Sequence, residues 1–233
     1  MRKTLAALTL AAALCLSGCS TSQAQISRYN AGVYVRGVLD ETYTGSPAAD
    51  YLKMVDHTPQ QAREVFEKNL DAEYDQRLAL RFELEEQYVP RTLREDFLAL
   101  LDKVYEKASY TVKSTTLMEG GRYCVELSVT PVTFFAAAYS DGYAQLRRDF
   151  DLTHSLPPDQ ESEDMSEAQL RRAREDYESA WAQEVYDYLY TRLDHITTGP
   201  AVTLLVLVSP DSQGLYTLSA TDLQNVDDLI LQY

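Results

Sequence analysis

The spacing of apolar residues predicts that most of the chain is helical. Apolar side chains recur every three to four residues in seven stretches, which is the period of a helix with one face against a core. The clearest stripe follows Pro90 and consists of Leu93, Phe97, Leu100, Leu101 and Val104. The predicted helices cover residues 28–44, 47–55, 59–86, 90–104, 134–149, 167–196 and 222–230. The pattern is less regular over residues 78–86, where a break in the third helix is the alternative.

Four further stretches have a period of two, which is typical of strands. They cover residues 110–117, 122–130, 201–208 and 215–219. Gly120-Gly121 and residues 209–214 provide two turns, so the strands form two hairpins. We expect one antiparallel sheet with helices on one face, in a helix-rich α+β fold. Because residues 201–208 are apolar on both sides of the strand, we expect this strand in the centre of the sheet.

Capping residues mark several helix ends. Ser27 is the expected cap of the first helix, and Ser166 the expected cap of the longest one. Thr58 with Gln61 and Thr221 with Gln224 have the spacing of a capping box. Between the predicted helices, Pro157-Pro158 and the acidic residues after it form the clearest break in the chain.

The N-terminus has the three parts of a secretory signal. Arg2 and Lys3 precede an apolar run over residues 4–16, which is too short to span a membrane. The residues Leu16-Ser17-Gly18-Cys19 that end this run resemble the lipobox of bacterial lipoproteins. The resemblance implies that Cys19 becomes the first mature residue and receives a diacylglyceryl group. We therefore expect a signal peptide over residues 1–18, a lipidated tether over 19–27 and one α+β domain over 28–233.

The charge narrows the range of partners. The formal net charge is −15, which argues against nucleic acid and against attraction to an anionic membrane surface. The expected membrane contact is the bilayer itself, through acylated Cys19, on the extracytoplasmic face of the cell membrane. Once the signal is removed and Cys19 is acylated, Cys124 is the one cysteine left, so no intramolecular disulfide is expected.

Several short stretches resemble a family of uncharacterised lipoproteins of Gram-positive bacteria, which contain a domain of unknown function. These stretches are residues 34–45, with Val38-Leu39-Asp40, residues 105–112, 125–131 and 214–229. The resemblance implies a helix-rich α+β fold and a place in the cell envelope, and it implies no activity. The order of hairpins and helices is also similar to cystatin-like and nuclear-transport-factor-2-like domains, which is an analogy of fold alone.

The residues able to do chemistry are scattered. His57, His154 and His195 are isolated in sequence and lack the spacing of a metal site, so a structural role is favoured for each. Cys124 lies in a strand on the same side as Glu126, where either a reactive thiol or a half-buried structural thiol fits, and the structural role is favoured.

The acidic residues 159–164 suggest a calcium loop, but the spacing argues against one. An EF-hand loop needs glycine at its sixth position and glutamate at its twelfth, where this chain has Asp164 and Leu170. A solvated acidic loop is the favoured interpretation, and we expect no metal and no cofactor.

The sequence favours a binding or interaction domain over an enzyme. It contains no nucleophile elbow, no phosphate-binding loop and no Ser-x-x-Lys element. The expected partner is an envelope protein or a small ligand. Two alternatives remain: an envelope hydrolase or isomerase with carboxylates in a sheet-lined pocket, and an accessory subunit of a transporter.

The longest predicted helix is aromatic over a wide arc. Tyr186, Tyr190 and Leu193 form a stripe on this helix. It is displaced by roughly 100° from a second stripe on the same helix, which consists of Tyr177, Trp181, Val185, Tyr188 and Ile196. Packing between a sheet and a helix would explain both stripes, and this is the favoured account. The other account is that Tyr186, Tyr190 and Leu193 line a groove for a ligand or partner, and we expect at least one of the two tyrosines to be exposed.

Overall fold

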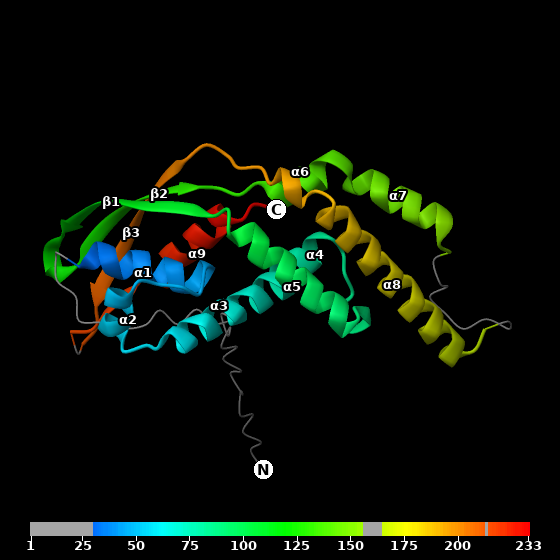
Figure 1. Cartoon of the computed structure of the whole chain (residues 1–233), viewed down its shortest axis with the longest axis horizontal. Coiled ribbons are helices and arrows are strands. Elements are labelled where there is room, and N and C mark those ends of the chain that lie inside the picture. The colour runs from blue at the N-terminus through cyan, green and yellow to red at the C-terminus, as the bar shows by residue number, and fades with distance from the viewer. Residues whose placement is uncertain (1–29, 156–164, 213) are drawn as a thin grey trace, which may run out of the picture.

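The computed structural model describes residues 30–155, 165–212 and 214–233. The molecule is elongated, with a sheet at one end and the helices α7 and α8 at the other (Figure 1). The expected Ser27 cap, the break at residues 156–164 and the signal with Cys19 lie outside the described residues.

The sheet confirms the α+β prediction. Its strands are β1 (Ser109–Leu117), β2 (Tyr123–Thr130), β3 (Val202–Pro210) and β4 (Tyr216–Leu218). They lie in the order β1-β2-β3-β4, and every neighbouring pair is antiparallel. The turn between β1 and β2 places Gly120 and Gly121 at φ 73°, a left-handed conformation that favours glycine.

Strand β2 has the predicted dry and wet sides. Tyr123, Val125, Leu127 and Val129 are buried, whereas the residues between them are half-buried. Cys124 lies on the wetter side opposite Thr116 and Leu207.

Strand β3 is an inner strand as predicted, but the reason given for its position was wrong. We expected burial on both faces, whereas the outward-facing Leu205 is 64% exposed. The inner position comes from pairing with β2 on one side and β4 on the other. Only the face with Val206 and Val208 is buried, because helices cover that face alone.

The helices α1 (Ala31–Tyr43) and α9 (Ala220–Ile230) cover the inner face of the sheet (Figure 1). Beyond α1 lie α2 (Ala49–Val55) and α3 (Pro59–Glu73). Gly37 allows α1 and α2 to approach closely, since a Cβ at this position would lie 2.1 Å from ring atoms of Tyr51.

The other half of the molecule is helical. Its main elements are α5 (Arg91–Tyr105), α6 (Phe134–Ala138), α7 (Ala144–Thr153) and α8 (Glu167–Tyr190). Shorter elements are α4 (Ala79–Arg81), the 3-10 turns η2 (Glu86–Tyr88), η3 (Glu119–Gly121) and η5 (Leu193–His195), and the π-turns η1 (Tyr74–Leu78) and η4 (Tyr139–Tyr143). The single helix predicted over residues 134–149 is therefore interrupted by η4.

The predicted caps have different outcomes. At Thr58 both hydrogen bonds of the capping box are present, and Ser166 precedes α8 with Gln169 bonded to its backbone N–H. The cap predicted at Thr221 was wrong, because α9 begins at Ala220 and Ser219 accepts the hydrogen bond from the N–H of Asp222. Ser219 and Thr221 are both good capping residues, and the end of β4 at Leu218 makes Ser219 the first residue free to take this role.

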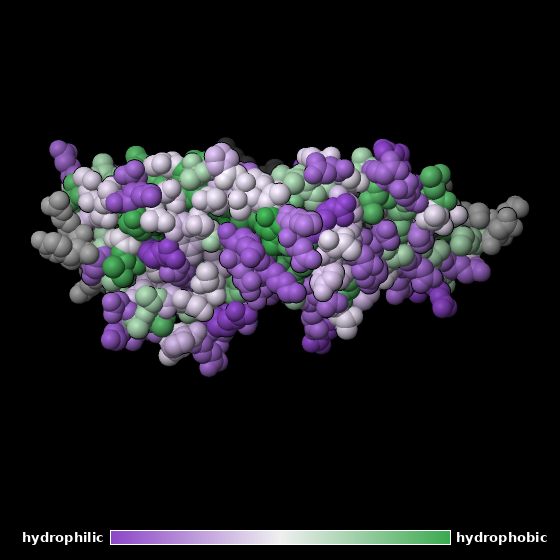
Figure 2. All heavy atoms as spheres, turned by 45° about the horizontal axis from the view of Figure 1, so that its top comes forward, coloured by the Kyte–Doolittle hydropathy of each residue, from purple (hydrophilic) through white to green (hydrophobic). Residues whose placement is uncertain are grey.

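Buried apolar side chains form one continuous cluster from Ala31 to Leu231 through both halves of the described chain. The surface is mixed: on the face drawn in Figure 2, hydrophilic residues predominate and hydrophobic ones gather near the middle of the long axis. No helix in the described residues has both the length and the apolar character that a membrane crossing requires.

Candidate functional site

The carboxyl end of α8 places the predicted aromatic pair at the surface. Tyr186 and Tyr190 are one turn apart, and their rings stack with centroids 5.5 Å apart. Tyr186 also meets the ring of Phe97 of α5 edge to face, at 5.4 Å between centroids. Tyr190 is 50% exposed. Tyr186 thus links α8 to α5, while Tyr190 offers a ring to solvent.

Helix α8 is shorter than predicted, which moves Leu193 out of it. The helix ends at Tyr190, not near residue 196, and side chains beyond its end bond one carbonyl of its last turn. Thr191 Oγ1 and Arg192 Nη1 both donate to the Tyr188 carbonyl, at 3.1 and 2.8 Å. Leu193 follows in the separate turn η5.

A pocket lies between the end of α8 and the end of α5, two helices that lie side by side (Figure 1). Its volume is about 450 Å³, within the range of small-molecule sites. Tyr190 and Leu193 line it, whereas Tyr186 is not a lining residue and contacts the site through its stack on Tyr190. The remaining lining residues are Lys103, Glu106, Lys107, Thr191, Asp194 and Ile196.

The sequence interpretation missed the side of the pocket formed by α5. Lys103 and Lys107 are two of the five lysines that follow Lys3 and are four residues apart, a spacing that places them on one helix face but does not indicate that they face α8. Lys103 Nζ lies 5.6 Å from the centroid of the Tyr190 ring, a cation–π geometry across the two helices.

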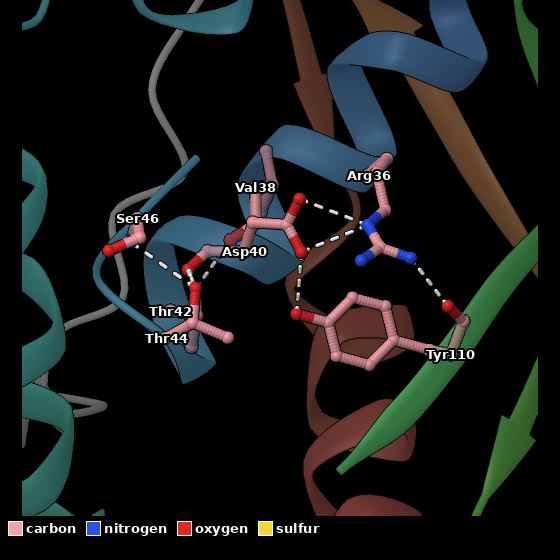
Figure 3. Close-up of polar contacts among 7 residues, drawn as sticks. All are labelled: Arg36, Val38, Asp40, Thr42, Thr44, Ser46 and Tyr110. Carbon is pink, nitrogen blue, oxygen red and sulfur yellow. Dashed lines mark hydrogen bonds and ion pairs between the residues drawn. The ribbon is translucent and has the colours of Figure 1, made fainter. Parts of the chain in front are cut away.

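A second hollow lies along α1, between α2 and β1, with a volume of about 470 Å³. Its main polar group is Arg36, whose Nε donates to both carboxylate oxygens of Asp40 at 2.9 Å (Figure 3). Arg36 Nη1 donates to the Tyr110 carbonyl at 2.6 Å, and the Tyr110 hydroxyl donates to Asp40 Oδ1 at 2.8 Å. Burial and the charge of Asp40 raise the pKa of Tyr110. These bonds fasten α1 to β1, so the polar groups of this hollow have a structural task.

Glu41 is buried with two polar partners. The Tyr51 hydroxyl donates to Glu41 Oε2 at 2.7 Å, and His57 Nδ1 lies 2.7 Å from Glu41 Oε1. These contacts join α1, α2 and the start of α3, and they give His57 a structural role.

The surroundings of the other two histidines do not indicate a catalytic or metal-binding role. His154 stacks on Phe150 with centroids 4.1 Å apart, and His195 lies exposed in η5. In the described part of the chain, no group of three or more histidine, cysteine or acidic residues has the geometry to hold a metal ion. The acidic residues 159–164 fall outside that part.

A buried acidic cluster lies where α3 and η1 meet α9. Glu73 is buried with Oε1 3.6 Å from Arg77 Nε, and the Tyr43 hydroxyl donates to Asp227 Oδ1. Burial raises the pKa of Glu73, and the charge of Arg77 opposes this change. Burial also raises the pKa of Asp227 to about 6; the Tyr43 hydrogen bond opposes the change and the charge of Glu73 adds to it. Tyr105 completes the cluster, and its pKa is raised by burial and by Glu73.

Comparisons with known proteins do not assign the chain to a family. No family model and no curated protein sequence matches it. A crystal structure of a "putative lipoprotein (ycdA)" from Bacillus subtilis subsp. subtilis str. 168 is similar with a TM-score of 0.49 and 13% sequence identity. The match covers 84% of this chain and 54% of that one, so the chain spans about half the length of that protein. The likeness to cystatin-like and nuclear-transport-factor-2-like domains stays a prediction.

Proposed function

We propose that this protein is a lipid-anchored binding protein on the extracytoplasmic face of the membrane, with its ligand site in the pocket between α5 and α8. The observation that supports the site best is the half-exposed Tyr190 ring. This ring stacks on Tyr186, and the Lys103 ammonium group lies over it in a cation–π contact. Aromatic rings with a polar tip are favoured at binding surfaces because they give a large contact area with few rotamers to freeze. The anchor rests on the lipobox at residues 16–19.

Binding fits this pocket better than catalysis. Its lining residues include no histidine or cysteine, so it lacks the commonest general base and the strongest nucleophile. The buried carboxylates elsewhere are bound by tyrosine, arginine or histidine. These contacts give them structural tasks, which favours the binding interpretation over the hydrolase or isomerase.

The anchor predicts the behaviour of a Cys19→Ala variant. Without the thiol no diacylglyceryl group can be attached, so we expect the protein to leave the detergent-soluble membrane fraction. The measurement is fractionation followed by detergent phase partitioning, with Cys124→Ala as the control that removes a thiol outside the lipobox. Equal membrane retention of the Cys19→Ala variant and the wild type would show that the anchor assignment is wrong.

The site predicts a separation of stability from binding at Tyr190. Because half of this side chain is exposed, Tyr190→Ala should change the free energy of unfolding by less than about 1 kcal/mol. The same change should abolish the thermal stabilisation given by any ligand of the pocket. The measurement is a thermal-shift screen of amino acids, short peptides, sugars and organic acids against wild type and variant. If every compound that stabilises the wild type stabilises the variant equally, the ligand site lies elsewhere.

A further inference from the structure

The pocket between α5 and α8 contains four charged side chains, two of each sign. Lys103 and Lys107 come from the end of α5 and the residues just after it, with Glu106 between them, and Asp194 comes from η5. All four are exposed. Within the described residues, none of the four has an ion pair or a side-chain hydrogen bond, and the one charged contact is that of Lys103 with the Tyr190 ring.

No lysine in the described part of the chain has an ion pair, whereas several arginines elsewhere on the surface are bound to acidic side chains. Arg94, for example, contacts Asp71 and Asp75 at 2.6 and 2.8 Å. Arg36, Arg63, Arg91 and Arg147 also have carboxylate partners. The pocket therefore keeps both positive and negative groups available next to an apolar surface.

The apolar part of the pocket consists of the Tyr190 ring, Leu193 and Ile196. A ligand that uses the whole site needs an apolar side chain, an anionic group and a cationic group. A phosphate or other polyanion would meet Glu106 and Asp194 as like charges, and a purely apolar molecule would desolvate four charges without pairing them. The pocket volume of about 450 Å³ suits a peptide of two or three residues.

We propose, building on the function proposed above, that the ligand is a short peptide with free termini and an apolar side chain. Its carboxylate lies between Lys103 and Lys107, its ammonium group pairs with Glu106 and Asp194, and its side chain packs on Tyr190, Leu193 and Ile196. Charged hydrogen bonds at both ends select the zwitterion, and the apolar contact gives a preference for larger side chains.

The test uses the dipeptide leucyl-phenylalanine and the purified full-length protein, with binding measured by calorimetry and by NMR titration. The free dipeptide should bind at least about tenfold more tightly than its N-acetylated form and than its C-amidated form, since each blocked end loses one charged interaction. The double variant Lys103→Gln with Lys107→Gln should lose the preference for the free carboxylate. The double variant Glu106→Gln with Asp194→Asn should lose the preference for the free amine.

The control variants Lys113→Gln and Glu119→Gln remove the same charges from exposed positions of the β1–β2 hairpin and should leave binding unchanged. If free and blocked dipeptides bind equally and Tyr190→Ala abolishes binding, the site stands and the choice of a zwitterion is wrong. If Tyr190→Ala leaves dipeptide binding unchanged, the proposed site is wrong as well. The peptide assignment is also wrong if the free dipeptide does not bind at a dipeptide concentration of about 10 mM, which is close to the weakest affinity of a specific small ligand.

Discussion

Trp181→Ala is expected to lower the free energy of unfolding by about 3–5 kcal/mol, the usual cost of removing a buried aromatic side chain. Trp181 is fully buried in α8, and its Nε1–H donates to the Phe82 carbonyl at 3.1 Å. Its ring lies against Phe150 and Tyr143, with centroids 5.1 and 5.9 Å away. The residue therefore joins α8 to α7 and to the segment after α4, and its loss leaves a cavity between three elements.

Two further variants separate the contributions to this effect. Trp181→Phe keeps an aromatic ring but loses the hydrogen bond to Phe82, so we expect a smaller loss of about 1–3 kcal/mol. Tyr190→Ala removes an aromatic side chain from the same helix at an exposed position and serves as the matched control. Urea denaturation followed by circular dichroism measures all three. A Trp181→Ala loss no larger than that of Tyr190→Ala would contradict the packing described for α8.

The sequence was informative wherever one local pattern decides the structure. The alternation from Tyr123 to Thr130 follows directly from a strand with one buried face, and that is what β2 shows. The capping box at Thr58 involves residues only three positions apart, so tertiary contacts had little influence on it. The pairing of the two hairpins into one sheet was predictable because both hairpins offer an apolar face and a short turn.

Features that depend on contacts between distant segments were not predictable. The π-turn at Tyr139–Tyr143 breaks an apolar pattern that looks continuous, and there Tyr188 from α8 donates to the Ala138 carbonyl at 2.5 Å. Helix α8 ends at Tyr190 although neither Thr191 nor Arg192, the next two residues, is a helix breaker such as glycine or proline.

The candidate site divides in the same way. The aromatic stripe on α8 was visible as a periodic pattern, which identified Tyr186 and Tyr190. Lys103 and Lys107 lie about eighty residues earlier, and no local pattern indicates that the end of α5 faces the end of α8. Glu73 and Asp227 are likewise brought together only by the fold, so their raised pKa values could not be read from a chain rich in acids.

Asp227→Asn is expected to stabilise the protein relative to the wild type, by an amount that increases with pH. The pKa of Asp227 is raised to about 6 in the folded protein from an ordinary value of 3.8. A raised pKa gives a stabilising contribution that is complete below about pH 4 and is lost as pH rises through about 6. The loss is about 2–3 kcal/mol for a shift of this size. Asparagine stays neutral and can still accept the hydrogen bond from Tyr43, so the variant avoids this loss.

The measurement is the free energy of unfolding in urea at several values between pH 4 and pH 8. The difference between Asp227→Asn and the wild type should grow by about 2–3 kcal/mol over this range and level off above about pH 7. Asp176→Asn is the control, since it removes the same charge from an exposed position of α8 and reports the effect of net charge alone. A difference that is constant with pH, or that is equal for the two variants, would show that Asp227 is not held in an environment that disfavours its charge. The growth expected here has a structural reason: the carboxylate lies beside buried Glu73, and Arg77 is the one cation that lowers the pKa of both groups.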